Sequence, residues 1–191
     1  HYKDTLEAGA QLCDPQAVQS IVEAGPKAIE RLVSLGVEFD RISTGTYDLT
    51  REGGHSQRRI LHTQDVTGRE IDRALRAKLQ ATSNIRVLTN HIAIDLITRP
   101  QESGTAKRCV GAYVLNNETG SVDTVRAKAV LLATGGAGKV YLYTSNPDVS
   151  TGDGVAMAYR AGATVANMEF FQFHPTCLYH PKAKSFLISE A

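Results

Sequence analysis

The chain lacks most features of disulfide-rich, membrane and nucleic-acid-binding proteins. Its 191 residues include only three cysteines, Cys13, Cys109 and Cys177, which lie far apart and form no C-x-x-C pair. This pattern indicates reduced thiols and a cytoplasmic location. Apolar runs are far shorter than the roughly 20 residues that cross a bilayer, and no basic-then-apolar leader opens the chain. With 21 basic and 20 acidic residues, neither a nucleic-acid partner nor a membrane partner is expected.

Three motifs of catalysis or binding are also absent. No G-x-S-x-G nucleophile elbow and no G-x-G-x-x-G dinucleotide fingerprint occur in the sequence. Neither His55 with His62 nor His174 with His180 has the i, i+4 spacing that places two metal ligands on one helical face. We therefore expect neither a serine nucleophile nor a bound metal.

Helices are predicted where apolar residues recur at helical spacing between end signals. Asp14 is an N-cap for the first helix, and Gly36 ends it. Thr67 and Glu70 have the spacing of a capping box for the second, and Asp153 caps the third. The three predicted helices span about Pro15–Leu35, Thr67–Ala81 and Asp153–Ala161.

Short β-strands are predicted between the second and third helices, with Asn117–Gly120 as a hairpin turn. They form a small antiparallel insertion. The predicted strands are Ile85–Leu88, Ile92–Thr98, Cys109–Asn116 and Ser121–Arg126. Ala129–Ala133 is continuously apolar and runs into Thr134-Gly135-Gly136, which favours a buried strand of a parallel sheet. The predicted fold class is therefore α/β, in the mixed α+β sense.

Arg51–His62 is rich in arginine and histidine and carries the single carboxylate of Glu52 beside Gly53-Gly54. Paired glycines permit close approach of a ligand to the backbone, and arginine binds carboxylates through two hydrogen bonds. A solvated basic loop explains the same residues. The pattern alone leaves both interpretations open.

Two glycine-rich segments are candidates for cofactor contacts. Ala133–Gly138 could cradle a phosphate or let a flat ring stack on the backbone, but a tight turn has the same composition. Thr151–Gly154 contains Asp153, which either caps a helix or also accepts hydrogen bonds from a ribose hydroxyl. Further along, Gln172 and His174 alternate with aromatic residues, so in extended chain both could reach one ligand. The alternative is that His174 is a structural residue of the core, with its hydrogen bonds made inside the protein.

Taken in this order, the segments resemble one flavoprotein family, that of succinate dehydrogenase, fumarate reductase and L-aspartate oxidase. The later motifs resemble the whole family, whereas the run REGGHSQRRILHTQDVTGREI resembles its L-aspartate oxidase branch. The resemblance covers the whole chain but only part of the family's length. It implies that 1–168 is the central part of an FAD-binding domain, without the N-terminal Rossmann strand-turn-helix, and that 169–191 begins the substrate-capping region.

The resemblance also implies roles for individual residues. The substrate would be held by Gln172, His174 and Ser189, the last replacing a threonine common in the family. Glu52 would attract the ammonium group of aspartate where the succinate enzymes have an apolar residue, so Glu52 and His174 are the candidate catalytic residues. The residues that match cofactor contacts are Ala93 for adenine, Asp153 for ribose, and Ala133, Thr134, Gly135 and Gly136 in a turn close to FAD.

The activity implied by the resemblance is hydride transfer from Cα of L-aspartate to flavin N5, giving iminoaspartate, with oxygen or fumarate as the electron acceptor. This reaction begins quinolinate and NAD biosynthesis, which implies a functional link to quinolinate synthase. A fumarate reductase or succinate dehydrogenase flavoprotein is one alternative, against which Glu52 and the GGHSQRR run argue. Another is a non-catalytic fragment. The 191 residues alone are expected to be inactive and to bind FAD weakly or not at all.

Overall fold

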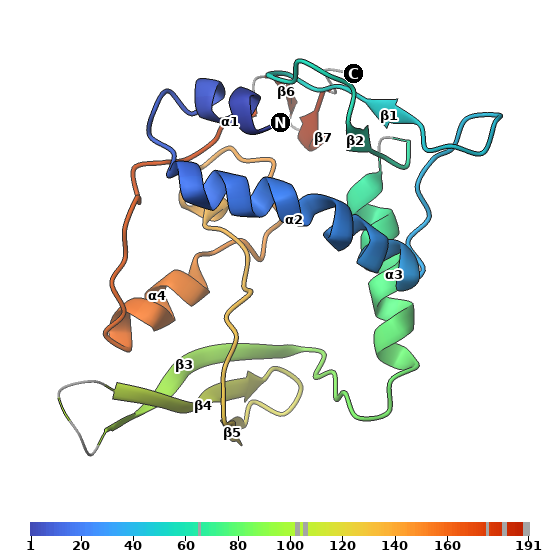
Figure 1. Ribbon diagram of the computed structural model, residues 1–191. Coiled ribbons are helices and arrows are strands. Elements are labelled where there is room, and N and C mark those ends of the chain that lie inside the picture. The colour runs from blue at the N-terminus through green and yellow to red at the C-terminus, as the bar shows by residue number, and fades with distance from the viewer. Residues whose placement is uncertain (65, 102–103, 105–106, 175, 181–182, 189–191) are drawn as a thin grey trace. The chain divides into compact units, whose positions relative to one another are not determined.

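The computed structural model describes residues 1–64, 66–101, 104, 107–174, 176–180 and 183–188 (Figure 1). The chain divides into two compact units, His1–Val87 and Leu88–Ala191, here called the N-terminal and C-terminal units. Both combine helices with small antiparallel sheets, so the predicted mixed α/β fold class is confirmed.

The N-terminal unit contains three helices and a two-stranded sheet. Its core consists of Val37, Phe39 and Ala74, against which six further apolar side chains pack. Three of these, Ile29, Leu32 and Val33, lie on the second helix, so its apolar stripe faces the core. The elements of this unit are α1 Tyr2–Ala8, α2 Pro15–Ser34, β1 Leu49–Thr50, β2 Ile60–Leu61 and α3 Thr67–Gln80.

Helix α2 begins and ends as its sequence predicts. The Asp14 carboxylate accepts hydrogen bonds from the backbone N–H groups of Gln16 and Ala17, at 2.8 and 3.1 Å. At the other end, Gly36 has a φ of +98°, a conformation that costs glycine little. The Val37 N–H then donates to the Leu32 carbonyl at 3.1 Å, which closes the helix with a Schellman motif.

The predicted capping box of α3 is wrong. The N-cap is Val66, and Thr67 is already the first helical residue. The carboxylate of Glu70 does not turn back to the helix start, because it accepts hydrogen bonds from the Glu38 N–H at 2.9 Å and from Arg73. A tertiary partner has replaced the local one.

The C-terminal unit contains a three-stranded antiparallel sheet in the order β3-β4-β5, which confirms the predicted small insertion. The β4–β5 turn is the predicted Asn117–Gly120 segment, where the side chain of Asn116 accepts from the Glu118 N–H at 2.9 Å. The elements are β3 His91–Pro100, β4 Lys107–Asn116, β5 Val122–Arg126, the 3-10 helix η1 Gly138–Val140, α4 Asp153–Arg160, β6 Cys177–His180 and β7 Ala183–Leu187.

Two predicted strands do not form. Ile85–Leu88 and Ala129–Ala133 both lack regular structure, and Leu131 is 90% exposed where a buried side chain was expected. Apolar composition makes a segment suitable for a strand, but a strand also needs a neighbour for its backbone hydrogen bonds. No strand among the described residues pairs with either segment.

Helix α4 forms where predicted, with a different start. Gly152, at a φ of +80°, is the N-cap, and Asp153 is the first helical residue rather than the cap. Gly162 has a φ of +95° and the Ala163 N–H donates to the Ala158 carbonyl at 3.0 Å, so the helix closes with a Schellman motif. The side chain of Asp153 is therefore not needed to cap the helix.

Candidate cofactor and substrate site

The glycine-rich turn lies against the start of α4, within the C-terminal unit. The Gly152 N–H donates to the Gly136 carbonyl at 3.2 Å. Gly154 is buried and has no room for a Cβ, because the Thr134 side chain occupies that space. The structure thus brings the cofactor candidates Thr134 and Gly136 close to Asp153.

The same turn has features that suit a flat or phosphorylated ligand. Ala133, Thr134 and the two glycines that follow are exposed. A Cβ built on Gly135 or Gly136 would have no atom within 4 Å, so a ligand could approach their backbone. The carboxylate of Asp153 is exposed at the helix start and makes no hydrogen bond or ion pair with the described residues. These residues fit a bound dinucleotide such as FAD.

Ala93, the candidate for an adenine contact, lies half-buried on β3 beside an irregularity in the β3–β4 pairing. Helix α4 packs against this strand. Arg160 of α4 donates to the Asp95 carboxylate at 3.0 Å and to the Ile94 carbonyl at 2.9 Å. The hydrogen bonds that the Asp95 carboxylate accepts from Arg160 and from the Leu96 N–H lower its pKa. Ala93 and Asp153 therefore lie on elements that pack together.

The Gln172–His174 segment lies beside an aromatic cluster formed by Tyr141, Phe171 and Phe173. The centroid of the Tyr141 ring lies 4.6 Å from that of Phe171 and 5.2 Å from that of Phe173. Gln172 and His174, at the alternate positions, are both exposed. Both side chains are therefore open to solvent.

His174 is tied to the loop that follows the glycine-rich turn. Its Nδ1 atom forms a hydrogen bond with the Ser145 hydroxyl. The next residue, Asn146, packs its side chain against buried Gly138 at the end of that turn. Ser145 was not identified from the sequence, because an isolated serine in a loop carries no signal of its partner. Ser189 lies outside the described residues.

Glu52 belongs to the N-terminal unit, in the loop between β1 and β2. The backbone N–H of Glu52 donates to His55 Nδ1 at 3.3 Å. The backbone N–H of His55 donates to the Glu52 carbonyl at 3.1 Å. The Glu52 side chain is exposed and makes no hydrogen bond or ion pair with the residues that the structure describes. The turn is thus held through the backbone of Glu52, and its carboxylate remains available to a ligand.

The loop that carries Glu52 is fastened to α1 by Asp4, another residue that the sequence did not single out. One oxygen of Asp4 accepts from the Ser56 N–H at 2.8 Å, from the Ser56 hydroxyl at 2.9 Å, and from Arg59. The Arg59 and Asp4 side chains are only 18% and 14% exposed. This partly buried ion pair fixes the loop on its C-terminal side.

Much of the basic character of Arg51–His62 is used within the fold. Arg58 donates to the Leu49 carbonyl at 3.1 Å. His62 lies between two carboxylates, with Nδ1 3.5 Å from Asp40 and Nε2 3.7 Å from Asp48. The segment is therefore not a purely solvated loop, and its cations are not all free to bind a ligand.

Other kinds of site find no support in the described part of the chain. Its histidines, cysteines and carboxylates form no group of three or more that could hold a metal ion. Each described helix is too short or too polar to cross a bilayer.

Curated relatives match this chain over its whole length. It is 57% identical to L-aspartate oxidase 1 of Ralstonia nicotianae and 54% identical to L-aspartate oxidase of Pseudomonas aeruginosa. Each alignment covers 100% of this chain, but only 36% and 37% of the respective relative. The chain thus spans a little over a third of the length of these relatives.

Two solved structures have a similar fold over nearly the whole chain. Mycobacterium smegmatis Sdh1 in complex with UQ1 superposes with a TM-score of 0.89 at 34% identity, covering 100% of this chain and 33% of the other. The FrdA chain of an E. coli quinol fumarate reductase variant gives 0.88 at 30% identity, covering 98% and 31%. The profile of the FAD binding domain family matches residues 1–191. The chain therefore belongs to the FAD binding domain family of flavoproteins, with FAD as its cofactor.

Proposed function

We propose that this chain is the central part of an FAD-dependent L-aspartate oxidase. Relatives of that name are 47–57% identical over the whole chain, whereas the Sdh1 and quinol fumarate reductase structures are 30–34% identical. The higher identity to the oxidases supports aspartate, rather than succinate, as the hydride donor.

The single observation that carries the proposal is the state of Glu52. Its carboxylate is exposed and unpaired among the described residues, while Asp4 and the His55 turn hold the surrounding loop. A carboxylate in this loop attracts the ammonium group of aspartate, whereas succinate has only hydrogen atoms on the corresponding carbon and gains no such contact. This is the discrimination needed between aspartate and succinate.

The remaining candidates divide between cofactor and substrate. Asp153 would accept hydrogen bonds from the ribose and Ala93 would contact adenine, while Ala133–Gly136 would lie along the cofactor. Gln172 and His174 would donate hydrogen bonds to the carboxylates of the substrate, as would Ser189. His174 would thereby orient the Cα–H bond, and positioning of this kind is the main contribution of a protein to cofactor chemistry.

Bound FAD would supply the redox chemistry by accepting a hydride from Cα of aspartate, which leaves iminoaspartate. Oxygen or fumarate would be the electron acceptor. The reaction would begin quinolinate and NAD biosynthesis, with quinolinate synthase as the functional partner. A cytoplasmic location is supported by the three free thiols.

We also propose that 1–168 is an incomplete FAD-binding domain and that 169–191 begins a substrate-capping region. On this basis the 191 residues alone would be inactive and retain little FAD. Absorbance in the flavin bands of the purified chain tests this point, and a stoichiometric flavin content would contradict it.

The test of the proposed activity compares aspartate with succinate as hydride donor to the full-length, FAD-loaded protein. Flavin bleaching under anaerobic conditions measures both reactions without dependence on the acceptor. Faster bleaching by aspartate is expected. Faster bleaching by succinate would assign the chain to the succinate dehydrogenase and fumarate reductase branch.

A further inference from the structure

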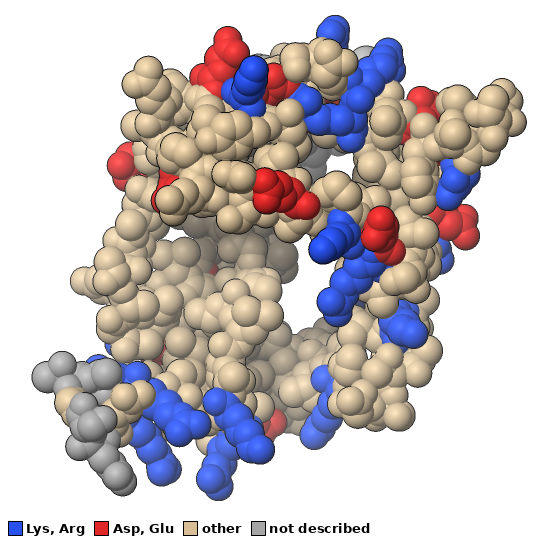
Figure 2. All heavy atoms as spheres, in the orientation of Figure 1, with Lys and Arg blue, Asp and Glu red and all other residues tan. Residues whose placement is uncertain are grey.

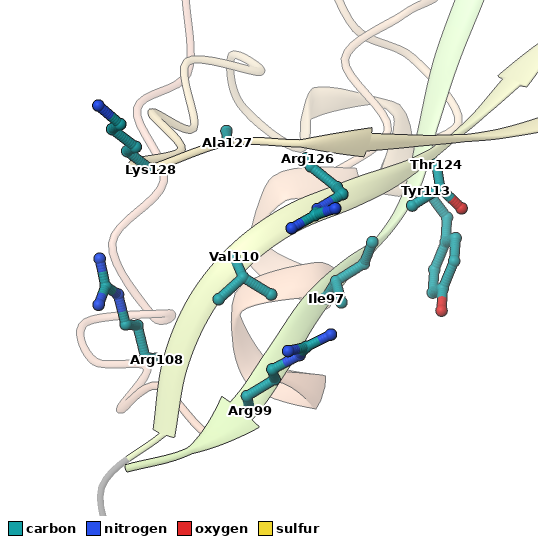
Figure 3. A pocket seen from close by; sticks show the side chains of 9 residues that line it. All are labelled: Ile97, Arg99, Arg108, Val110, Tyr113, Thr124, Arg126, Ala127 and Lys128. Atoms are coloured by element: carbon teal, nitrogen blue, oxygen red, sulfur yellow. The ribbon is translucent and has the colours of Figure 1, made fainter.

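A concavity of about 650 Å³ lies on one face of the β3-β4-β5 sheet, inside the C-terminal unit and apart from the candidate residues above. We call it the basic hollow. Figure 3 shows Arg99 and Arg126 extending over this face with Ile97 and Val110 between them. The residues that line it are Ile97, Arg99, Arg108, Val110, Tyr113, Thr124, Arg126, Ala127 and Lys128.

Among the described residues, four cations and no carboxylate line the hollow. Arg99, Arg108, Arg126 and Lys128 are all exposed, and none makes a hydrogen bond or ion pair with the described residues. Other cations of the described chain have carboxylate partners, as in Arg73–Glu70, Arg76–Asp72 and Lys139–Asp148. Figure 2 shows Lys and Arg side chains gathered over the sheet. What distinguishes this face is that four such cations line one concavity with no described carboxylate among them.

The sheet itself places two of these cations against each other. Arg99 of β3 and Arg108 of β4 are direct cross-strand partners, and like charges at such positions destabilise a sheet. Arg126 comes from the third strand, β5, paired with Gly111 of β4. Three neighbouring strands thus direct positive charge to one place, where an anion would relieve the repulsion.

We propose that the basic hollow binds a small molecule that carries at least two phosphate groups. The planar guanidinium of arginine donates two parallel hydrogen bonds to a phosphate, and four cations need more than one such group to be neutralised. The apolar floor of Ile97 and Val110 would contact the rest of the molecule. A volume of about 650 Å³ is typical of pockets for small ligands, which favours a metabolite over a nucleic-acid duplex.

The test uses isothermal titration calorimetry of inorganic tripolyphosphate into the full-length protein loaded with FAD, so that the flavin site is already filled. Arg99→Gln and Arg126→Gln each remove one guanidinium from the hollow. Arg86→Gln is the matched control, because Arg86 is also exposed but is not among the residues that line the hollow. All three positions are at the surface, and thermal unfolding of each variant checks that the fold is intact.

Binding of one tripolyphosphate per chain is expected, with the Kd raised about tenfold or more by Arg99→Gln and by Arg126→Gln and unchanged by Arg86→Gln. Arg126→Lys should retain part of the affinity, since it keeps the charge. The proposal is overturned by the absence of saturable binding, or by equal affinities in all variants. Tighter binding of a short DNA duplex through the same arginines would replace the small molecule with a nucleic acid. None of these outcomes bears on the choice between aspartate and succinate.

Discussion

The hydroxyl of Ser145 meets Nδ1 of His174, a residue 29 positions later in the chain. A hydroxyl can donate a hydrogen bond to Nδ1, and a neutral imidazole that accepts there carries its hydrogen on Nε2. An Nε2–H group is the donor that a substrate carboxylate needs. A carbonyl or carboxylate at Nδ1 would instead favour the opposite tautomer of neutral histidine.

Replacement of Ser145 by alanine should therefore weaken substrate binding through His174. We expect the KM for aspartate of the full-length enzyme to rise about three- to tenfold, the usual effect of one hydrogen bond, with a smaller change in kcat. Ser145→Thr keeps the hydroxyl and should behave like the original protein. Equal kinetics for the alanine and threonine variants would remove the proposed role of Ser145.

Asp4 should stabilise the protein far more than an ordinary surface carboxylate. Asp4→Ala leaves Arg59 without its partner in a mostly buried position, where the Arg59 Nε already has no partner among the described residues. We expect a loss of about 2–4 kcal/mol in the free energy of unfolding, measured by urea denaturation. The control is Asp72→Ala, which breaks an exposed ion pair with Arg76 and should cost less than about 1 kcal/mol. Similar losses in the two variants would contradict this account.

Glu70 should make the stability of the protein sensitive to acid. Hydrogen bonds from Arg73 and from the Glu38 N–H lower the pKa of its carboxyl from 4.5 to about 2. The unfolded chain therefore takes up this proton at a higher pH than the folded chain, so the stabilisation is complete above the unfolded pKa and lost as the pH falls toward 2.

Urea unfolding at a series of acidic pH values measures this effect. Glu70→Gln should be less stable than the original protein near neutral pH and should lose less stability as the pH falls through this window. Glu30→Gln, at an exposed position of α2, should keep the original pH dependence. An unchanged pH dependence in Glu70→Gln would show that other groups cause it.

The parts of the fold that could be predicted are those whose signals lie close together in the sequence. Asp14 and Gly36 mark the ends of α2 by contacts with residues only a few positions away. The turn at Asn117–Gly120 is similarly local. The capping box failed because Glu70 found its partner at Glu38, which is 32 residues away.

Strands and sites depend on such distant partners more than helices do. Ala129–Ala133 has the composition of a buried strand, yet no described strand pairs with it. The glycine-rich turn and Asp153 could be chosen from their motifs, and they do lie together. Asp4 and Ser145 could not be chosen, because each acts on a segment tens of residues away.

The central claim is that Glu52 selects an amino-dicarboxylate, and Glu52→Gln in the full-length, FAD-loaded enzyme tests it most directly. The measurement is kcat/KM for aspartate oxidation and for fumarate reduction, in the original protein and in the variant. Aspartate oxidation should fall by more than about tenfold, since a charge-assisted contact with the ammonium group is lost. Fumarate has no ammonium, so its reduction should change little. Equal losses in the two reactions would contradict the claim.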